Sequence, residues 1–125
     1  MSIIGNAVTV GSGGGEPELL WTNPKPTLAQ ANFSVTLPTG YSAYLVEFRN
    51  YTYADAGTGI LYVPFGTSGW ASGFIWYTYN DTGYARKITS VTDGEIVFGY
   101  SQNGSSGTGS QRGIPTRIWG VKWTI

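Results

Sequence analysis

The sequence predicts an all-β protein: an antiparallel β-sandwich, jelly-roll-like in arrangement, preceded by a glycine-rich arm at the N-terminus. β-branched and aromatic residues fill its apolar segments, and Gly, Asn, Asp, Ser and Thr separate them. No long window holds the apolar period of about 3.6 residues that an amphipathic helix needs. Roughly eight or nine short strands at this spacing are typical of a sandwich.

The chain divides into an N-terminal arm, residues 1–15, and a β-sandwich domain, residues 16–125. The arm ends in the letters GSGGG, which is the composition of a flexible linker. The strand-like segment 3–10 before this linker is therefore expected to lie outside the sandwich. Its apolar residues are the candidate anchor to other proteins: Ile3, Ile4, Val8 and Val10.

Within the domain, apolar segments bounded by turn residues predict strands at residues 19–21, 32–37, 43–53, 60–64, 73–79, 85–91, 95–100 and 116–124. Alternation is clear in segment 43–53, where Tyr44, Val46 and Phe48 share one side. Asp93-Gly94 predicts a two-residue hairpin, because glycine adopts the positive φ that such a turn requires. Residues 27–31 are expected to form one helical turn at most.

The closing segment 116–124 alternates between two faces, and Gly120 and Lys122 share the less apolar one. Trp119, Val121 and Trp123 lie on one face, and Ile118 lies on the other. A terminal strand this apolar would fray and aggregate unless it were paired and buried. We therefore expect Trp119 to be a core or interface residue.

The composition excludes several classes of function. The chain has no cysteine and no histidine, which removes disulfides, thiolate metal sites and the commonest general base. Seven basic and seven acidic residues balance, so no nucleic-acid partner is expected. Segment 56–80 carries no charge, but its glycines and Pro64 argue against insertion into a membrane as a helix. Residues 1–10 lack the pattern of a signal peptide.

No catalytic motif is present, and a pair of carboxylates is the one enzymatic route that this composition leaves. The acidic residues are Glu16, Glu18, Glu47, Asp55, Asp81, Asp93 and Glu95. Three of them stand in turn motifs, where an aspartate side chain ordinarily bonds to nearby backbone amides. We therefore predict a protein that is not an enzyme and holds neither a cofactor nor a metal.

Aromatic residues make up 15% of the chain and concentrate in segment 70–84. Strand 73–79 would carry aromatic side chains on both faces, which favours core packing, a subunit interface or a platform for a sugar ring. The candidate ligand or interface residues are Trp70, Trp76, Tyr77, Tyr79, Tyr84 and Arg112. The Gly/Ser-rich segment 102–113 is either a plain surface hairpin or a recognition loop.

Two segments carry a resemblance to a known class of proteins. Residues 18–26 have the sequence ELLWTNPKP and residues 114–125 have the sequence IPTRIWGVKWTI, behind the glycine-rich stretch 11–15. Over roughly residues 16–125 the chain resembles the small terminal β-domains of bacteriophage tail-fibre and related virion surface proteins. The resemblance implies a virion structural protein, assembled in the host cytoplasm and mounted on other virion proteins by its arm. It also implies a homo-oligomer, expected to be a trimer, with an outward surface that is a candidate to bind host-cell glycan.

Two alternatives stay open. The chain begins at Met1 without the long shaft of a tail fibre, which favours a capsid decoration or head-fibre protein anchored by its N-terminal arm. A free-standing carbohydrate-binding module is the other alternative, since aromatic side chains and the polar loop 102–113 suit hydroxyl-rich ligands.

Overall fold

The computed structural model describes residues 15–51, 58–71, 84–103 and 112–123, with only the backbone described at a few strand ends. These residues form eight strands and no helix. The strands are β1 (Glu18–Thr22), β2 (Phe33–Thr36), β3 (Ala43–Tyr51), β4 (Thr58–Pro64), β5 (Gly69–Ala71), β6 (Tyr84–Thr92), β7 (Glu95–Asn103) and β8 (Arg112–Val121).

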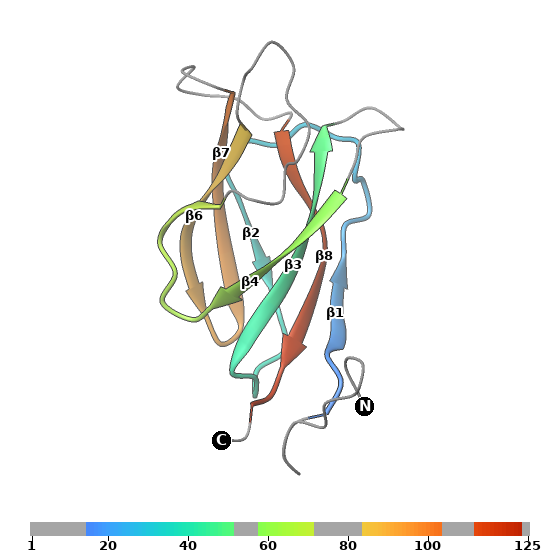
Figure 1. Ribbon diagram of the computed structural model, residues 1–125, viewed down its shortest axis with the longest axis vertical. Coiled ribbons are helices and arrows are strands. Elements are labelled where there is room, and N and C mark those ends of the chain that lie inside the picture. The colour runs from blue at the N-terminus through green and yellow to red at the C-terminus, as the bar shows by residue number, and fades with distance from the viewer. Residues whose placement is uncertain (1–14, 52–57, 72–83, 104–111, 124–125) are drawn as a thin grey trace.

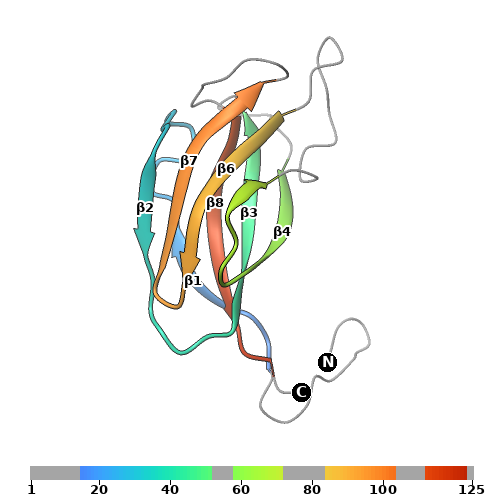
Figure 2. The ribbon, with the colours of Figure 1, turned by 90° about the vertical axis from the view of Figure 1, so that its left-hand side faces the viewer.

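The strands form two four-stranded antiparallel sheets packed face to face (Figures 1 and 2), which confirms the predicted sandwich. Sheet A has the order β1-β8-β3-β4 and sheet B the order β2-β7-β6-β5. The first strand thus pairs with the last and the second with the seventh, while β3 and β6 each also pair with the strand that follows them. The finer jelly-roll description stays a prediction, and the arm, residues 1–14, lies outside the described residues.

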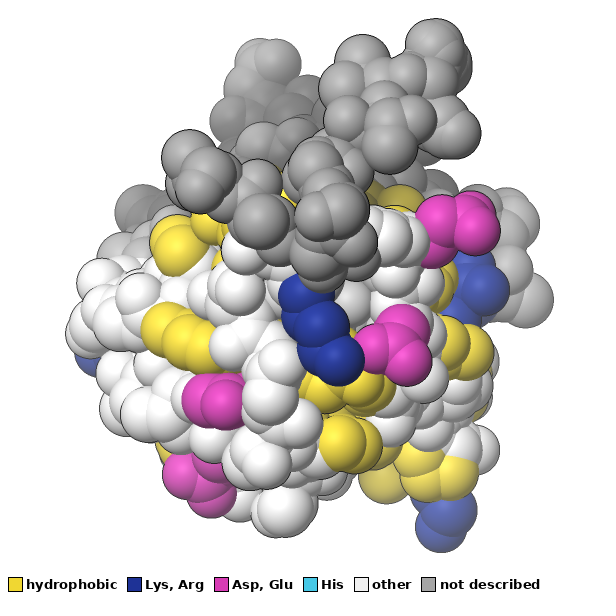
Figure 3. Space-filling view, turned by 90° about the horizontal axis from the view of Figure 1, so that it is seen from below, with side chains coloured by type: hydrophobic (Ala, Val, Ile, Leu, Met, Phe, Trp, Pro, Cys, Tyr) yellow, Lys and Arg dark blue, Asp and Glu magenta, His cyan; other side chains and the backbone are white. Residues whose placement is uncertain are grey.

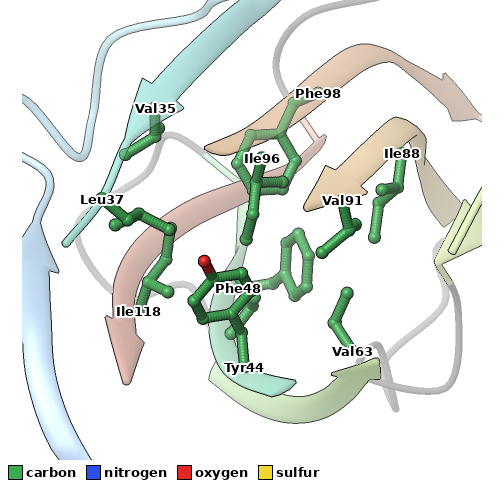
Figure 4. Close-up of a cluster of buried hydrophobic side chains, with 11 residues drawn as sticks. Val35, Leu37, Tyr44, Phe48, Val63, Ile88, Val91, Ile96, Phe98 and Ile118 are labelled. Carbon is green, nitrogen blue, oxygen red and sulfur yellow. The ribbon is translucent and has the colours of Figure 1, made fainter. Parts of the chain in front are cut away.

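The core lies between the two sheets and is built from their alternating inward residues (Figure 4). Phe48 of β3 and Phe98 of β7 meet at its centre, with ring centroids 6.1 Å apart and an edge-to-face geometry. The buried cluster is Val35, Leu37, Tyr44, Val46, Phe48, Val63, Ile88, Val91, Ile96, Phe98 and Ile118. Tyr44, Val46 and Phe48, which the alternation of segment 43–53 placed on one side, all belong to this cluster.

The predicted hairpin at Asp93-Gly94 is confirmed, since Thr92 pairs with Glu95 across these two residues and Gly94 has a φ of 121°. The turn also ties the sheets together. The Asp93 carboxylate accepts hydrogen bonds from the backbone N–H groups of Gly40 at 2.9 Å and Tyr41 at 3.2 Å. The buried Tyr44 hydroxyl donates to the Thr92 carbonyl at 2.9 Å and accepts from the Gly94 N–H at 2.8 Å.

The closing strand differs from the expectation in its position and in which face is buried. It runs from Arg112 to Val121, so it begins before the predicted start at residue 116 and ends before Lys122 and Trp123, which the prediction had included. Ile118 supplies the core contact, whereas Trp119 is only partly buried and lies outside the core cluster. The core half of the prediction for Trp119 is thus wrong. Both faces of this strand are apolar, so alternation separates them without indicating which one is inside.

The sandwich has two distinct ends (Figure 1). The terminal end holds residues 15–17 and 122–123 together with the connections 37–42, 65–68 and 93–94. The opposite, distal end holds connection 23–32 and the strand ends that flank segments 52–57, 72–83 and 104–111, which lie outside the described residues. Predicted strand 73–79 falls in one of those segments.

Candidate functional site

The outer side of sheet A carries a continuous row of large apolar residues. Leu19 of β1 pairs with Trp119 of β8, Trp119 pairs with Leu45 of β3, and Leu45 pairs with Tyr62 of β4. Directly paired residues in antiparallel strands point to the same side of the sheet. One apolar residue from each of the four strands therefore lies in line across the face opposite the core.

Much of this row is open to solvent. Leu19 is 54% exposed, Tyr62 is 52% exposed, and Ile60 two residues before Tyr62 is 57% exposed. Trp123, 43% exposed, lies beside Tyr62 with ring centroids 6.3 Å apart. We call these residues the outer apolar face: Leu19, Leu45, Ile60, Tyr62, Trp119 and Trp123.

An ion pair whose two charges cancel lies on the two central strands of sheet A, β3 and β8, beside the apolar row. The Glu47 carboxylate accepts hydrogen bonds from Arg117 Nε at 2.9 Å and Nη2 at 2.7 Å, and from Thr116 Oγ1 at 2.7 Å. The bond from Arg117 holds the pKa of Glu47 below its ordinary value, although burial opposes it. The Arg117 guanidinium also lies over the Trp119 ring, 5.1 Å from its centroid. The pair therefore adds no net charge to the face.

The two sequence segments that carried the resemblance meet at this sheet. β1 pairs with β8, and Asn23, buried just after β1, continues the contact along β8. Its Nδ2 donates to the Pro115 carbonyl at 2.9 Å, and its backbone N–H donates to the Thr116 carbonyl at 2.7 Å. The Asn23 Oδ1 accepts from the Lys25 N–H at 2.8 Å, which shapes the proline-rich corner. In the sequence, Asn23 is visible only as a polar residue before Pro24, and its structural role was not predicted.

Arg86, a fully buried residue of β6, organises the distal end. Its Nη1 donates to the carbonyls of Gln30 and Ala31, both at 2.9 Å, and of Gly99 at 2.7 Å. Its Nε donates to the Gly113 carbonyl at 3.1 Å. Burial lowers the pKa of Arg86 to about 10, so the guanidinium stays protonated at neutral pH. Arg86 thereby joins sheet B to β8 and to connection 23–32.

The terminal end has a more mixed surface. Figure 3, which views the molecule from below, shows separate hydrophobic patches among polar surface, with basic side chains beside acidic ones. Lys122 lies 3.9 Å from a Glu18 carboxylate oxygen and 5.2 Å from the centroid of the Tyr41 ring. Tyr41 packs closely over Gly120, where an added Cβ would lie 2.5 Å from the ring. This end has no extended apolar row comparable with the outer face of sheet A among the residues described.

The residues predicted as a site are spread over both sheets. Trp70 of β5 pairs with Lys87 and Tyr84 of β6 pairs with Asn103, both in sheet B, whereas Arg112 begins β8 in sheet A. Trp76, Tyr77 and Tyr79 lie outside the described residues, as do the candidate anchors Ile3, Ile4, Val8 and Val10. The outer apolar face was not predicted, although the alternation of segments 43–53 and 60–64 already leaves apolar residues on both sides.

The part of the chain that the structure describes contains no group of three or more His, Cys, Asp or Glu side chains that could hold a metal ion. None of its elements is a helix long and apolar enough to span a membrane. Neither a family model, nor a curated protein, nor a solved structure matches the chain.

Proposed function

We propose that this protein is a non-catalytic structural domain of a phage virion, which assembles as a homo-oligomer and acts by surface contact. The outer apolar face carries this proposal. Exposed apolar patches of this kind mark protein contacts, and their aromatic content is typical of an interface. The Glu47–Arg117 pair is already satisfied within one copy, so burial of the face would leave no charge unpaired there.

The low charge of the chain supports the same conclusion. Charged residues are 11% of the sequence and the formal net charge is zero, a composition that promotes association. Like copies of a neutral chain approach one another without long-range repulsion.

The arrangement of the two ends of the sandwich supports a domain that is attached to the virion by its terminal end. The connection to the arm, at residues 15–17, leaves from the terminal end. At the opposite end, Tyr84 directly follows segment 72–83, Trp70 lies two residues before that segment, and Arg112 directly follows segment 104–111. A domain mounted on virion proteins through its arm would therefore present its distal end outward, and this end is the candidate surface for host-cell glycan.

Sedimentation velocity of the full chain, with antibody labelling of intact particles, tests this function. We expect a homo-oligomer in solution and label on the tail. Label on the head would favour the capsid decoration or head-fibre alternative. Specific signal on a glycan array without any particle labelling would favour a free carbohydrate-binding module, and a monomer at every concentration would contradict the assembly.

A further inference from the structure

Among the residues that the structure describes, each sheet of the sandwich has two edge strands, and three of these four edges are protected against pairing with another chain. β1 begins with Glu18 and has a register shift between Leu19 and Trp21. β2 has only four residues and β5 only three. Charges, bulges and short length are the usual means by which proteins keep sheet edges from associating.

β4 has no charge, no bulge and is not short, and its one proline, Pro64, is its last residue. It has seven residues with the sequence TGILYVP, none of them charged. Its pairing with β3 is regular over all seven residues, from Ala43 with Pro64 to Arg49 with Thr58. Among the described residues, β3 is the one strand that hydrogen-bonds to β4. The opposite backbone edge of β4 is thus a template for another strand.

We propose that two copies of this protein associate through β4, edge to edge and antiparallel, so that their two copies of sheet A form one continuous eight-stranded sheet. This proposal rests on the homo-oligomer proposed above and names an edge contact for it, which extends sheet A and leaves the outer apolar face open on one side of the extended sheet. It commits the assembly to a two-fold dimer in place of the trimer that the resemblance implies.

The side chains of β4 make this pairing self-complementary. A two-fold axis at Leu61 sets Ile60 of each copy opposite Tyr62 of the other, since antiparallel partners run in opposite directions. These are the two exposed large apolar residues of the strand, at 57% and 52%. Aromatic and β-branched residues form favourable cross-strand pairs.

A second copy also fits this edge better than a charged partner. The row that contains Ile60 continues through Glu47 and Arg117, whose charges compensate each other within one copy. A basic or acidic peptide would therefore meet no opposite charge along β4, whereas a second β4 would meet a neutral strand of matching side chains.

Sedimentation equilibrium of the full chain and of the Ile60→Lys variant tests the proposal. A lysine on this strand should weaken strand pairing, because it removes the Ile60–Tyr62 contact from both halves of the two-fold pair and places a charge on the edge strand, as natural edge strands do to prevent association. Leu28→Lys is the matched control, since Leu28 is 48% exposed on the connection between β1 and β2. We expect twice the chain mass of 13.4 kDa for the unmodified chain and for Leu28→Lys, and a monomer with the same circular dichroism for Ile60→Lys.

A register test uses the absence of cysteine from the chain. Ile60→Cys and Tyr62→Cys variants, mixed and oxidised, should give more covalent dimer than either variant alone, because the proposed register places residue 60 opposite residue 62. Equal yields would overturn this register. An unmodified trimer, or a dimer that Ile60→Lys leaves intact, would overturn the β4 contact but not self-association. A monomeric unmodified chain would contradict both this contact and the proposed homo-oligomer.

Discussion

The outer faces of the two sheets differ sharply in chemistry although their inner faces are alike. Outward rows of sheet B carry hydroxyl and carboxylate groups: Ser34 pairs with Val97, which pairs with Ser90, while Thr36 pairs with Glu95. The corresponding row of sheet A is Leu19, Trp119, Leu45 and Tyr62. A sandwich needs one apolar face on each sheet, and sheet A has two.

The difference shows which apolar residues fold the domain and which are left for contact. Core formation explains Phe98, which is fully buried, but not Tyr62, which is half-exposed on the opposite side of its sheet. Exposed apolar area in a row is costly for solubility and gains nothing in an isolated domain. The outer face of sheet A therefore carries exposed apolar residues that the core does not need, whereas the outward rows of sheet B carry polar groups that water satisfies.

The largest effect should separate an inner aromatic residue from an outer one. Phe98→Ala should lower the free energy of unfolding by about 3–5 kcal/mol, because it empties a buried aromatic site. Trp119→Ala removes a larger side chain that is only partly buried, and should cost about 1–2 kcal/mol in the monomer. Urea unfolding at low protein concentration measures both. Equal losses would mean that the outer face of sheet A is as essential to folding as the core.

Asn23 fastens β1, which carries Leu19 of the outer apolar face, to β8, and a substitution measures how much this attachment stabilises the domain. Asn23→Ala leaves the Pro115 carbonyl and the Lys25 N–H without their side-chain partner, at a cost of about 1–3 kcal/mol. Asn32→Ala is the control, because Asn32 is exposed on the same connection and should change stability by less than about 0.5 kcal/mol. Thermal unfolding followed by circular dichroism compares the two. Similar losses of stability in the two variants would mean that the hydrogen bonds of the Asn23 side chain are not what stabilises this connection.

The sandwich itself could be predicted because most of its strands are long enough to show alternation or end at strong turn signals. The Asp93-Gly94 hairpin and the shared side of Tyr44, Val46 and Phe48 in β3 follow from local chemistry alone. β5 was not predicted, since three residues beginning with a glycine give no period to detect. The early start of β8 was not predicted because Gly113 and Pro115, which are both disfavoured inside strands, indicated a start at residue 116.

Pro115 is tolerated in the sheet for reasons that only tertiary contacts supply. It lies beyond the last pair of β1 with β8, and the pairing of β8 with β3 shifts register between Glu47 and Phe48 beside it.

The candidate contact surface, the outer apolar face of sheet A, was not predicted for a related reason. Alternation assigns residues to two faces, but which face meets the other sheet depends on strands far away in the chain.

The ion pair on the outer face of sheet A should give a smaller, pH-dependent effect. Glu47→Gln should lower the free energy of unfolding by about 0.5–1 kcal/mol at neutral pH, a modest value because Arg117 is largely exposed. Arg117 lowers the pKa of Glu47 from 4.5, so the stabilisation is complete above pH 4.5 and is lost as the pH falls through the lower folded-state pKa. Urea unfolding of both proteins between pH 7 and about 3 follows this difference. A difference that grows on acidification would contradict the assigned pairing.

The smallest effect is expected on the outer face of sheet B. Ser34→Ala removes an exposed hydroxyl from β2, opposite Val97, and water takes the place of that group on a surface already in contact with solvent. Stability should change by less than about 0.5 kcal/mol, as for most surface substitutions. The sedimenting mass should also stay the same, because this face takes no part in the proposed contact through β4. A stability loss above about 1 kcal/mol, or a change in mass, would show that sheet B also contributes a contact surface and that the contrast between the two faces is incomplete.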